Sequence, residues 1–431
     1  MKNKRFLFGM FLALIFPLAA CGGGDTPKPT PVGPGKYYNE ENFIKSSKSV
    51  ETTKLVTYDG PALLESSNEV SVKVEGKDLF VYETKFNHER VWGWKNPDTY
   101  SQVVNFDFEG KVKVDVTINK DIAITSAVLR PQVYGLQPTI SGKTISFYLT
   151  YSGNYVLEYN DDYRTAIHIF ANEIEKDPIT EEEAKADPNI IYVGPGLYKA
   201  GAIPTKENAT IYLAGGAYVY GQIRAEKINN LTIRGRGIIS GSIYTRNGEA
   251  DYTIPIVLRS VNNVLIEGIT FLDPAGWALN IYNCENVEIN NVKIITARSN
   301  GDGISLQSCR NVRVNGGYVR TWDDSLVVKN VDELSTDNIK FSGVVVWTDL
   351  AQSMEVGYET FGAKMNDITF ENIIVLHNFH KALISCHNSD NAEITNLTYK
   401  NIILEDGQML GDDREDGEND FFIDFTIAYS P

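Results

Sequence analysis

A short motif recurs along the second half of the chain: an Asn or Asp followed by alternating apolar and polar residues. The first apolar residue of each copy is its anchor, and the anchors of six clear copies lie 23 to 33 residues apart. The anchors are Leu231, Val264, Val287, Val312, Ile339 and Ile368, with Ile394 in a looser seventh copy. Each unit contains short β-branched strands punctuated by Asn and Gly, and no amphipathic helix of useful length.

A repeat of this length predicts a solenoid, in which each coil buries its inner residues against its neighbours. Strands without helices favour a parallel β-helix over residues 191–431; leucine-rich repeats are the alternative, but the Leu spacing does not match. We expect the Asn residues to stack as a ladder of side-chain hydrogen bonds at one turn. Because solenoids need a cap at each end, the apolar strand near residues 421–429 predicts either a truncated chain or an exposed edge prone to association.

The preceding segment, residues 49–172, predicts an antiparallel β-sandwich. Short runs such as Val70–Val74, Val112–Ile118 and Thr144–Leu149 alternate between apolar and polar residues and are separated by turn signals. Residues 173–190 are charged and are expected to form a linker or a short helix.

The composition excludes one broad class of function. The 431 residues carry a net charge of -16, whereas a nucleic-acid binder needs a surplus of Lys and Arg to neutralise phosphates. A hydrophobic content of 42% is sufficient for a packed core, and four Cys are too few for a disulfide scaffold of this size.

The N-terminus predicts export. A basic start (residues 2–5) precedes an apolar run (6–20) that is too short for a membrane span, which needs roughly twenty residues. The run ends in Leu-Ala-Ala-Cys21, which resembles the lipobox of bacterial lipoproteins; an ordinary signal peptide with a stray Cys is the alternative. We therefore expect a signal peptide at 1–21, lipidation of Cys21, a flexible tether at 22–48, and a lipoprotein at the outer membrane, cell surface or periplasm.

Two cysteines occupy equivalent positions in consecutive coils. Cys284 and Cys309 each precede an anchor by three residues, so we expect them to stack, either as a buried pair of thiols or as a disulfide. No Cys or His cluster has the spacing of metal ligands, and we expect neither a metal nor a cofactor.

Carboxylates open the hydrophobic strand of three consecutive coils. Asp302 precedes one strand, Asp323 and Asp324 the next, and Glu355 lies at the third, so we expect all four in one surface groove. Neighbouring carboxylates raise one another's pKa, because they cannot all ionise cheaply. Hydrolysis of a glycosidic bond needs this condition, since one carboxyl must be protonated while another activates water. An Asp-Asp pair alone is weak evidence for catalysis. A pair that lies one coil after an Asp-Gly, at the same edge of a stacked sheet, is stronger evidence.

The motifs Asn300-Gly-Asp302-Gly-Ile and Asp323-Asp324-Ser-Leu-Val-Val-Lys329 resemble those of glycoside hydrolase family 28, the polygalacturonases. That family carries Asn-Thr-Asp-Gly and Asp-Asp-Cys on a right-handed parallel β-helix. The sandwich ahead of the solenoid is similar to that of family 49, the dextranases and isopullulanases of the same clan. The resemblance covers about residues 190–405 for the solenoid and about 50–170 for the sandwich.

The resemblance implies an inverting mechanism. Asp323 matches the general acid that protonates the leaving oxygen, and Asp302 and Asp324 match the pair that activates the attacking water. Inverting enzymes separate acid and base by about 6.5–9.5 Å, a gap that neighbouring coils can supply.

Two departures from the family pattern bear on the substrate. Gln352 stands where the family has the His of Gly-His-Gly, and the family's Arg-x-Lys, which grips a galacturonate carboxylate, is absent near residues 382–385. Both count against a polyanionic pectin, which the negative net charge would also repel. The residues predicted to bind the sugar are Asn300, Lys329, Gln352, Glu355, Glu359, His380 and Lys381, with His387 nearby. Glu355 and Glu359 suit neutral sugar hydroxyls; a solvated rim is their alternative role.

These observations predict a surface-anchored glycoside hydrolase acting on a polysaccharide, with the membrane as its second partner and no nucleic acid. Two alternatives stay open. One is a polysaccharide lyase that uses carboxylate-held Ca²⁺ and a basic residue, although the motif strands lack an Arg. The other is a non-catalytic solenoid that binds glycans.

Overall fold

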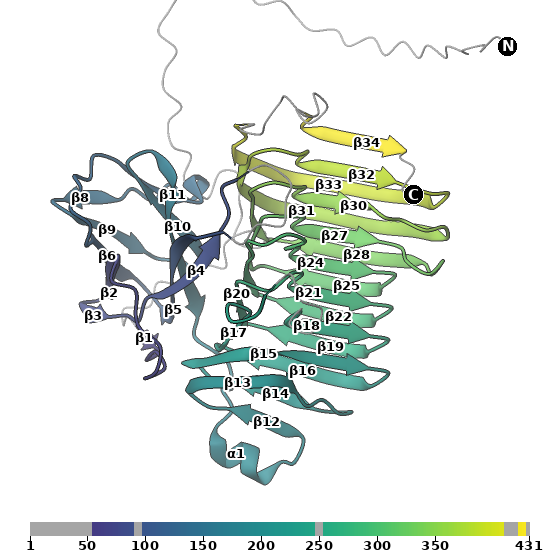
Figure 1. Cartoon of the computed structure of the whole chain (residues 1–431), viewed down its shortest axis with the longest axis horizontal. Coiled ribbons are helices and arrows are strands. Elements are labelled where there is room, and N and C mark those ends of the chain that lie inside the picture. The colour runs from purple at the N-terminus through teal and green to yellow at the C-terminus, as the bar shows by residue number, and fades with distance from the viewer. Residues whose placement is uncertain (1–53, 90–96, 246–252, 409–420, 428–431) are drawn as a thin grey trace, which may run out of the picture.

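The computed structural model describes residues 54–89, 97–245, 253–408 and 421–427, which form a β-sandwich followed by a long solenoid (Figure 1). The solenoid strands stack one above another, and the sandwich lies alongside them. The predicted fold class, an all-β chain with a right-handed parallel β-helix behind a sandwich, is confirmed. The predicted signal peptide, Cys21 and tether lie outside the described residues. Across the described ranges, no helix has both the length and the apolar character to cross a membrane.

The sandwich consists of two sheets whose alternating residues meet in a shared core. One sheet contains β1 (Lys54–Thr57), β4 (Tyr82–Phe86), β5 (Thr99–Glu109), β7 (Ala127–Arg130), β10 (Gly153–Tyr159) and β11 (Asp162–Glu173). The other contains β2 (Val70–Val74), β3 (Lys77–Asp78), β6 (Val112–Ile118), β8 (Thr139–Ser141) and β9 (Thr144–Leu149). The predicted strands β2, β6 and β9 are present, with alternate residues buried. One pair, β5 and β11, is parallel, so the prediction of a wholly antiparallel sandwich is wrong at this point. Alternation reports which face is buried but not the direction of the neighbouring strand.

The linker contains one short helix, α1 (Glu181–Ala186), and the solenoid begins directly after it. The Thr180 hydroxyl accepts a hydrogen bond from the Glu183 amide, and the Glu183 carboxylate accepts one from the Thr180 amide, which closes a capping box. The first solenoid strands are β12 (Ile190–Val193), β13 (Gly196–Ile203), β14 (Thr210–Leu213) and β15 (Ala217–Glu226).

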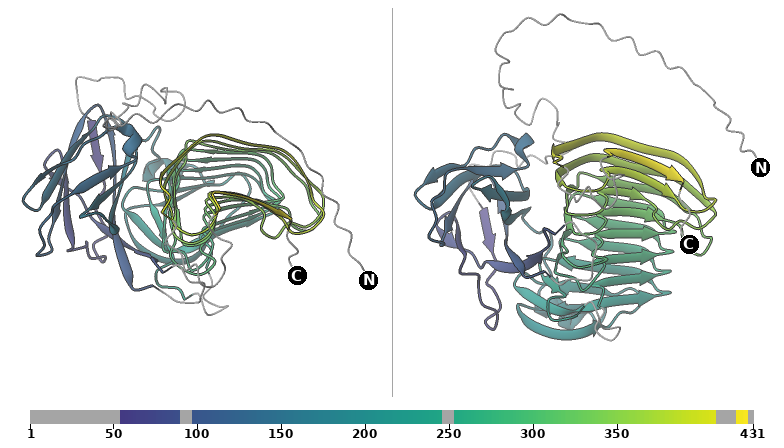
Figure 2. Two further views of the ribbon diagram at one scale, coloured as in Figure 1. Left: turned by 90° about the horizontal axis from the view of Figure 1, so that it is seen from above. Right: turned by 45° about the horizontal axis from the view of Figure 1, so that its top comes forward.

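Most later coils contribute one strand to each of three parallel sheets. The site sheet contains β18 (Ile256–Arg259), β21 (Leu279–Tyr282), β24 (Ile304–Gln307), β27 (Leu326–Lys329), β30 (Met354–Val356), β32 (Ile384–Asn388) and β34 (Ile423–Ile427). The ladder sheet contains β16 (Asn229–Gly235), β19 (Asn262–Glu267), β22 (Glu285–Asn290), β25 (Arg310–Asn315) and β28 (Thr336–Ser342). The sandwich-facing sheet contains β17 (Ile238–Ser240), β20 (Thr270–Leu272), β23 (Lys293–Ile295), β26 (Tyr318–Thr321) and β29 (Val345–Thr348). The long strands β31 (Lys364–Asn378) and β33 (Glu393–Asp406) continue both the ladder sheet and the sandwich-facing sheet. Seen from above, successive coils superimpose (Figure 2).

The predicted anchors occupy the same register position in successive coils. Leu231 pairs with Val264, and the series continues without a slip to Ile368. The seventh anchor is wrong: Ile368 pairs with Leu397, whereas Ile394 pairs with Met365. Asn396, which precedes Leu397, has a φ of 54° and adopts the left-handed conformation found at the turn of the earlier coils.

The Asn ladder is present. The side-chain amides of Asn263, Asn286, Asn311 and Asn338 each donate to the Asn carbonyl of the preceding coil, at 2.8–3.3 Å. These residues have φ values of 53–57°. Asn tolerates this left-handed region and carries both a donor and an acceptor, so it suits a stacked turn on both counts.

Apolar side chains from all three sheets fill the interior of the solenoid, and the two cysteines lie among them. Cys284 and Cys309 flank the paired residues Glu285 and Arg310, so they stack as expected. Both are free thiols, and Cys309 Sγ donates to the carbonyl of Ile281 at 3.3 Å. Burial raises the pKa of Cys284 to about 11, as in an inert structural thiol.

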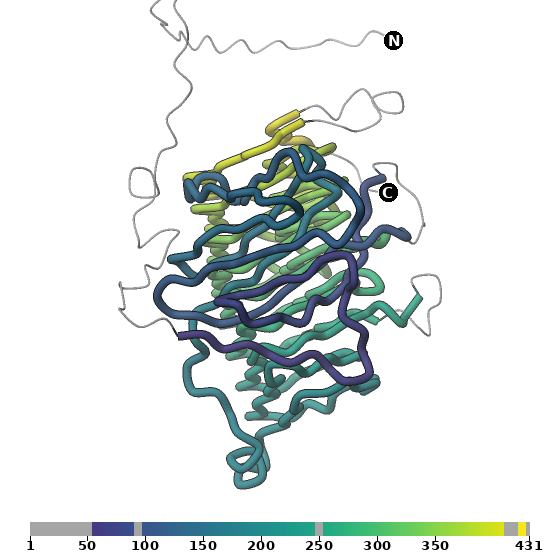
Figure 3. The backbone as a smooth tube through the Cα atoms, turned by 90° about the vertical axis from the view of Figure 1, so that its left-hand side faces the viewer, coloured from purple at the N-terminus to yellow at the C-terminus, as the bar shows by residue number. Residues whose placement is uncertain are grey.

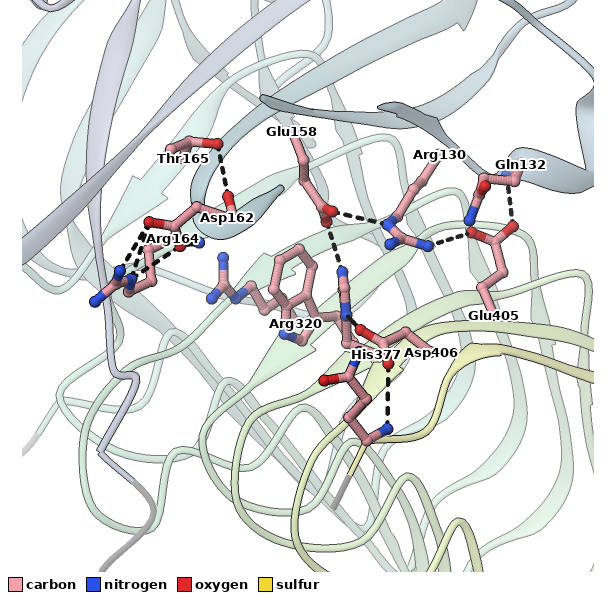
Figure 4. A network of polar contacts seen from close by, with 12 residues as sticks. Arg130, Gln132, Glu158, Asp162, Arg164, Thr165, Arg320, His377, Glu405 and Asp406 are labelled. Atoms are coloured by element: carbon pink, nitrogen blue, oxygen red, sulfur yellow. Dashed lines mark hydrogen bonds and ion pairs between the residues drawn. The ribbon is translucent and has the colours of Figure 1, made fainter. Parts of the chain in front are cut away.

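The sandwich packs against the sandwich-facing sheet (Figure 3). The shared apolar cluster includes Tyr82, Val156 and Phe170 of the sandwich and Tyr218, Leu272, Tyr318, Trp347 and Phe379 of the solenoid. A polar network extends this interface (Figure 4). Glu158 accepts from Arg130 and contacts His377, whose other ring nitrogen lies 2.8 Å from Asp406. Arg130 also reaches Glu405. The two parts are therefore joined by apolar contact and by paired charges.

A pair of substitutions at Asn286 tests the ladder. Asn286→Ala removes two ladder bonds and places Ala at a φ of 57°. We expect the free energy of unfolding to fall by about 1–3 kcal/mol, measured by urea denaturation. Asn286→Gly loses the same bonds but tolerates the backbone conformation, so it should cost about 1 kcal/mol less. Equal losses in the two variants would contradict the role of the left-handed turn.

Candidate active site

Two loops that lead from the sandwich-facing sheet into the site sheet carry the three aspartates. Asp302 lies just before β24, and Asp323 and Asp324 lie just before β27. Ile304 pairs with Leu326, and the amide of Gly303 donates to the carbonyl of Asp324 at 2.8 Å. Neighbouring strands are about 4.8 Å apart, so the register brings Asp302 beside Asp324.

Tight packing explains the glycines around Asp302. A Cβ on Gly303 would come within 2.5 Å of the Ser325 carbonyl, and one on Gly301 within 2.5 Å of the Arg298 carbonyl. Asn300 starts the turn with a φ of 52°. The sequence Asn-Gly-Asp-Gly thus lets the backbone of one coil rest directly on the next.

A row of hydrogen-bonded hydroxyl groups contacts the loop that carries Asp323 and Asp324. Thr321 Oγ1 donates to the carbonyl of Asp323 at 2.5 Å and lies 2.6 Å from Ser325 Oγ. The row continues through Thr348 and Ser353 to Asn378, with successive contacts of 2.7 Å. On the sandwich side, the Trp322 indole donates to the carbonyl of Glu89 at 2.9 Å. Trp322 and Ser325, which flank Asp323 and Asp324, are therefore both held by hydrogen bonds.

Backbone amides bind two of the three carboxyl groups. The amide of Gln352, in the next coil, donates to Asp324 Oδ1 at 2.9 Å. Asp323 accepts from the amides of Asp324, at 3.1 Å, and Asn300. Two residues predicted as sugar ligands, Asn300 and Gln352, thus contact the aspartates through their main chains.

Burial raises the pKa of all three carboxyl groups, and repulsion by neighbouring aspartates adds to it at Asp302 and Asp324. Asp302 is 4% exposed, and Asp323 and Asp324 are 8% exposed. Burial, followed by the charges of its neighbours, holds the pKa of Asp302 and of Asp324 well above the ordinary range. Burial raises the pKa of Asp323 to about 6, against the opposing effect of its amide hydrogen bonds and of Lys329. Because the groups interact, protons leave the cluster in steps that belong to the cluster as a whole. Ionisation of one carboxyl therefore makes ionisation of the next more difficult.

Lys329 is a buried cation beside this cluster. It is 4% exposed, and its Nζ lies 2.8 Å from Glu359 Oε2 and 5.4 Å from the centroid of the Trp277 ring. Burial alone would lower the pKa of Lys329, but Asp302 and Glu359 outweigh it and hold the pKa above its usual value. The Glu359 side chain is 52% exposed.

The sequence predicts that Glu355 lies in an open groove with the aspartates, and this prediction is wrong about the open groove. Glu355 is fully buried, with Oε2 accepting from the Ser385 hydroxyl and Oε1 lying 2.8 Å from His387 Nδ1. His387 Nε2 lies 3.1 Å from Asp424 on β34. Burial lowers the pKa of His387, but the two carboxylates outweigh it and raise the pKa to about 9. Strand alternation gave a signal for this contact, because Glu355 and Ser385 pair across adjacent strands and His387 follows on the same face.

The remaining predicted ligands lie in the loop after β31. His380 is buried, with Nδ1 3.3 Å from the carbonyl of Leu350, and the carbonyl of half-buried Lys381 accepts from Asn378. The structure thus gathers Asn300, Lys329, Gln352 and Glu359 around the aspartates. The charge of buried Glu355 also raises the pKa of Asp324, whereas His380 and Lys381 have contacts of their own. Among the described residues, no group of three or more His, Cys, Asp and Glu side chains is arranged to hold a metal ion.

Comparison with known proteins matches the region that carries this site. Residues 206–411 match the family model for glycosyl hydrolases family 28. The resemblance to family 28 is confirmed. An exopolygalacturonase of Oenothera organensis is 27% identical over 168 residues, which cover 33% of this chain and 46% of the relative. An exopolygalacturonase clone of Arabidopsis thaliana is 22% identical over 249 residues, covering 51% of this chain and 56% of the relative. The chain thus spans about half the length of these relatives.

Among solved structures, Dex49A from Penicillium minioluteum is similar across both parts of the chain. Its TM-score is 0.52 at 15% identity, and the alignment covers 82% of this chain and 86% of that one. At this level of identity the similarity concerns the fold alone.

The contacts of His387 predict a pH-dependent contribution to stability. Its pKa is about 9 in the folded chain and 6.5 without these contacts, so the contribution is complete below about pH 6.5 and is lost as the pH rises through about 9. At pH 6 we expect His387→Gln to lower the free energy of unfolding by about 1–3 kcal/mol. Urea denaturation between pH 6 and 10 should show this difference shrinking. Asp424→Asn, which leaves one carboxylate partner, should show a smaller pH dependence, and a difference that is constant with pH would contradict the assignment.

Proposed function

We propose that the chain is a glycoside hydrolase that cleaves O-glycosidic bonds of a polysaccharide with inversion of the anomeric carbon. The observation that carries the proposal is the meeting of Asp302, Asp323 and Asp324 from two adjacent coils in buried surroundings that raise their pKa values. The family 28 match and the aligned exopolygalacturonases support a glycosidase.

In this proposal the three carboxyls divide the acid and base roles. Asp323 protonates the departing glycosidic oxygen, and Asp302 and Asp324 hold and deprotonate the water that attacks the opposite face of the sugar. Acid and base must be in different protonation states at the same pH. A buried carboxyl cluster meets this requirement, because loss of its first proton makes loss of the next more difficult.

We further propose a neutral or weakly charged sugar as the substrate. Lys329, whose charge acts on all three aspartates, is buried and paired with Glu359, and residues 382–384, two coils further on, are buried and apolar. The outer face of the site sheet carries two amides in adjacent coils, Asn280 and Gln307, which are bonded to each other at 3.1 Å. Amide side chains suit sugar hydroxyls, which both donate and accept.

A polysaccharide screen with matched variants tests the activity. We expect reducing ends to be released from a neutral polysaccharide in preference to polygalacturonate, with NMR showing the inverted anomer first. Asp302→Asn and Asp323→Asn should each lower kcat by about 10²–10⁴-fold while leaving the fold intact. Glu371→Gln, a carboxyl-to-amide change on β31 where Glu371 pairs with Lys340, is the control and should keep full activity.

Other outcomes of the screen would contradict the proposal or favour another function. Full activity in both Asp variants would contradict the assigned roles, and a retained anomer would contradict inversion. Products with an unsaturated end that absorbs ultraviolet light would indicate a lyase. Binding without release of reducing ends across a broad glycan panel would indicate a binding solenoid.

We also propose that the chain is exported and anchored through a lipid on Cys21, on the basis of the lipobox-like sequence. The full-length protein expressed in a bacterium should partition into the detergent phase of Triton X-114 extracts, and Cys21→Ala should move it to the aqueous phase. Cys386→Ala, which changes a half-buried thiol in the solenoid, is the control and should leave the partition unchanged. An unchanged partition for Cys21→Ala would contradict the anchor.

A further inference from the structure

Lys329 is an ammonium group buried beside three carboxyl groups. Burying a charged amine is costly unless opposite charges and hydrogen bonds compensate it. Here Glu359 bonds the ammonium at 2.8 Å, and the Trp277 ring lies 5.4 Å from it, within the range of a cation–π contact. The group is therefore held in place before any ligand arrives.

The charged neighbours of Lys329 come from several coils. Its direct strand partner in the preceding coil is Gln307, which is neutral, and the following coil places Gly357 opposite it. The acidic groups that face it are Glu359, from the loop after β30, and Asp302 and Asp324, from the loops before β24 and β27. Trp277, whose ring the ammonium contacts, is followed by Ala278, whose amide donates to the carbonyl of Asp302 at 2.9 Å, so the ammonium lies near the loop that carries Asp302.

We propose that Lys329 is a positioning residue of the hydrolytic site: its ammonium group, fixed by Glu359 and Trp277, stabilises the ionised form of the carboxyl that activates water. This inference rests on the proposed function and changes the role of Lys329 from sugar ligand to electrostatic support. The ammonium already donates to Glu359 and lies over the Trp277 ring, so these contacts use part of its bonding capacity before a substrate binds.

The electrostatic balance of the cluster requires such a cation. Burial raises the pKa of all three aspartates, and the charges of neighbouring aspartates raise the pKa of Asp302 and Asp324 further, so an ionised base is favoured only where a positive charge opposes these effects. The charge of Lys329 opposes this effect at each of the three. Asp302 and Asp324 are the aspartates whose charges raise the pKa of Lys329 in return, so loss of the cation should be felt at the pair that activates water in the proposed mechanism.

The pH dependence of kcat/KM tests the role. The acidic limb reports ionisation of the base, so Lys329→Met should move that limb to higher pH by about one unit or more. Lys329→Arg keeps the charge and should return the limb close to its wild-type position, even if kcat is lower. Lys329→Gln is a second neutral variant in case the Met variant does not fold, which circular dichroism and thermal melting would reveal.

A second measurement is independent of activity. Titration of ¹³C-labelled Asp carboxyl groups by NMR in the full chain should show at least one carboxyl titrating at higher pH in Lys329→Met than in the wild type. Unchanged titrations and an unchanged pH profile, with only KM raised, would overturn the inference and make Lys329 a sugar ligand. An equal loss of activity at every pH would make it merely structural. If the wild type hydrolyses no polysaccharide, the proposed function fails, and the NMR titration still decides whether Lys329 controls the carboxyls.

Discussion

The in-register hydrogen bonding of successive coils is the constraint on which the rest of the structure depends. Strand side chains alternate with a period of two, so a slip of one residue would turn every inner residue outward. The Asn ladder at one turn and the close contact of Gly303 with the next coil both oppose such a slip. The same register places Asp302 beside Asp324, so the chemistry of the site follows from the stacking of the coils.

Features that depend on one position in every coil can be predicted from the sequence. Six anchors can be predicted because the stacked left-handed turn selects Asn, or Asp at position 367, which marks it in each of these repeats. The seventh anchor was placed wrongly because two stretches near the end of the solenoid fit the Asn template. The turn residue is Asn396. The proximity of the three aspartates could be predicted for the same reason, since they precede strands in neighbouring coils.

Features that depend on contacts between distant segments could not be predicted. Glu355 points outward from its strand, as alternation requires, but Ser385 and His387 from the next coil cover it, and Asp424 from β34 binds His387 in turn. Alternation places Glu355, Ser385 and His387 on one face, but no periodic signal marks Asp424, which binds His387 from β34. The same holds for the contact between Trp322 and the carbonyl of Glu89, because it joins the sandwich to a loop of the solenoid more than two hundred residues away.

The site sheet can contain buried charges because the surrounding fold is stable enough to offset their cost in free energy. Buried carboxyls lower stability unless they are neutralised or hydrogen-bonded. Here main-chain amides bind Asp323 and Asp324, Lys329 opposes their charge, and His387 is paired with Glu355. The remaining cost is offset by long apolar stacks whose stability does not depend on the site. A rigid solenoid can therefore keep these carboxyls close together in buried surroundings, a state that a more flexible scaffold would relieve by admitting water.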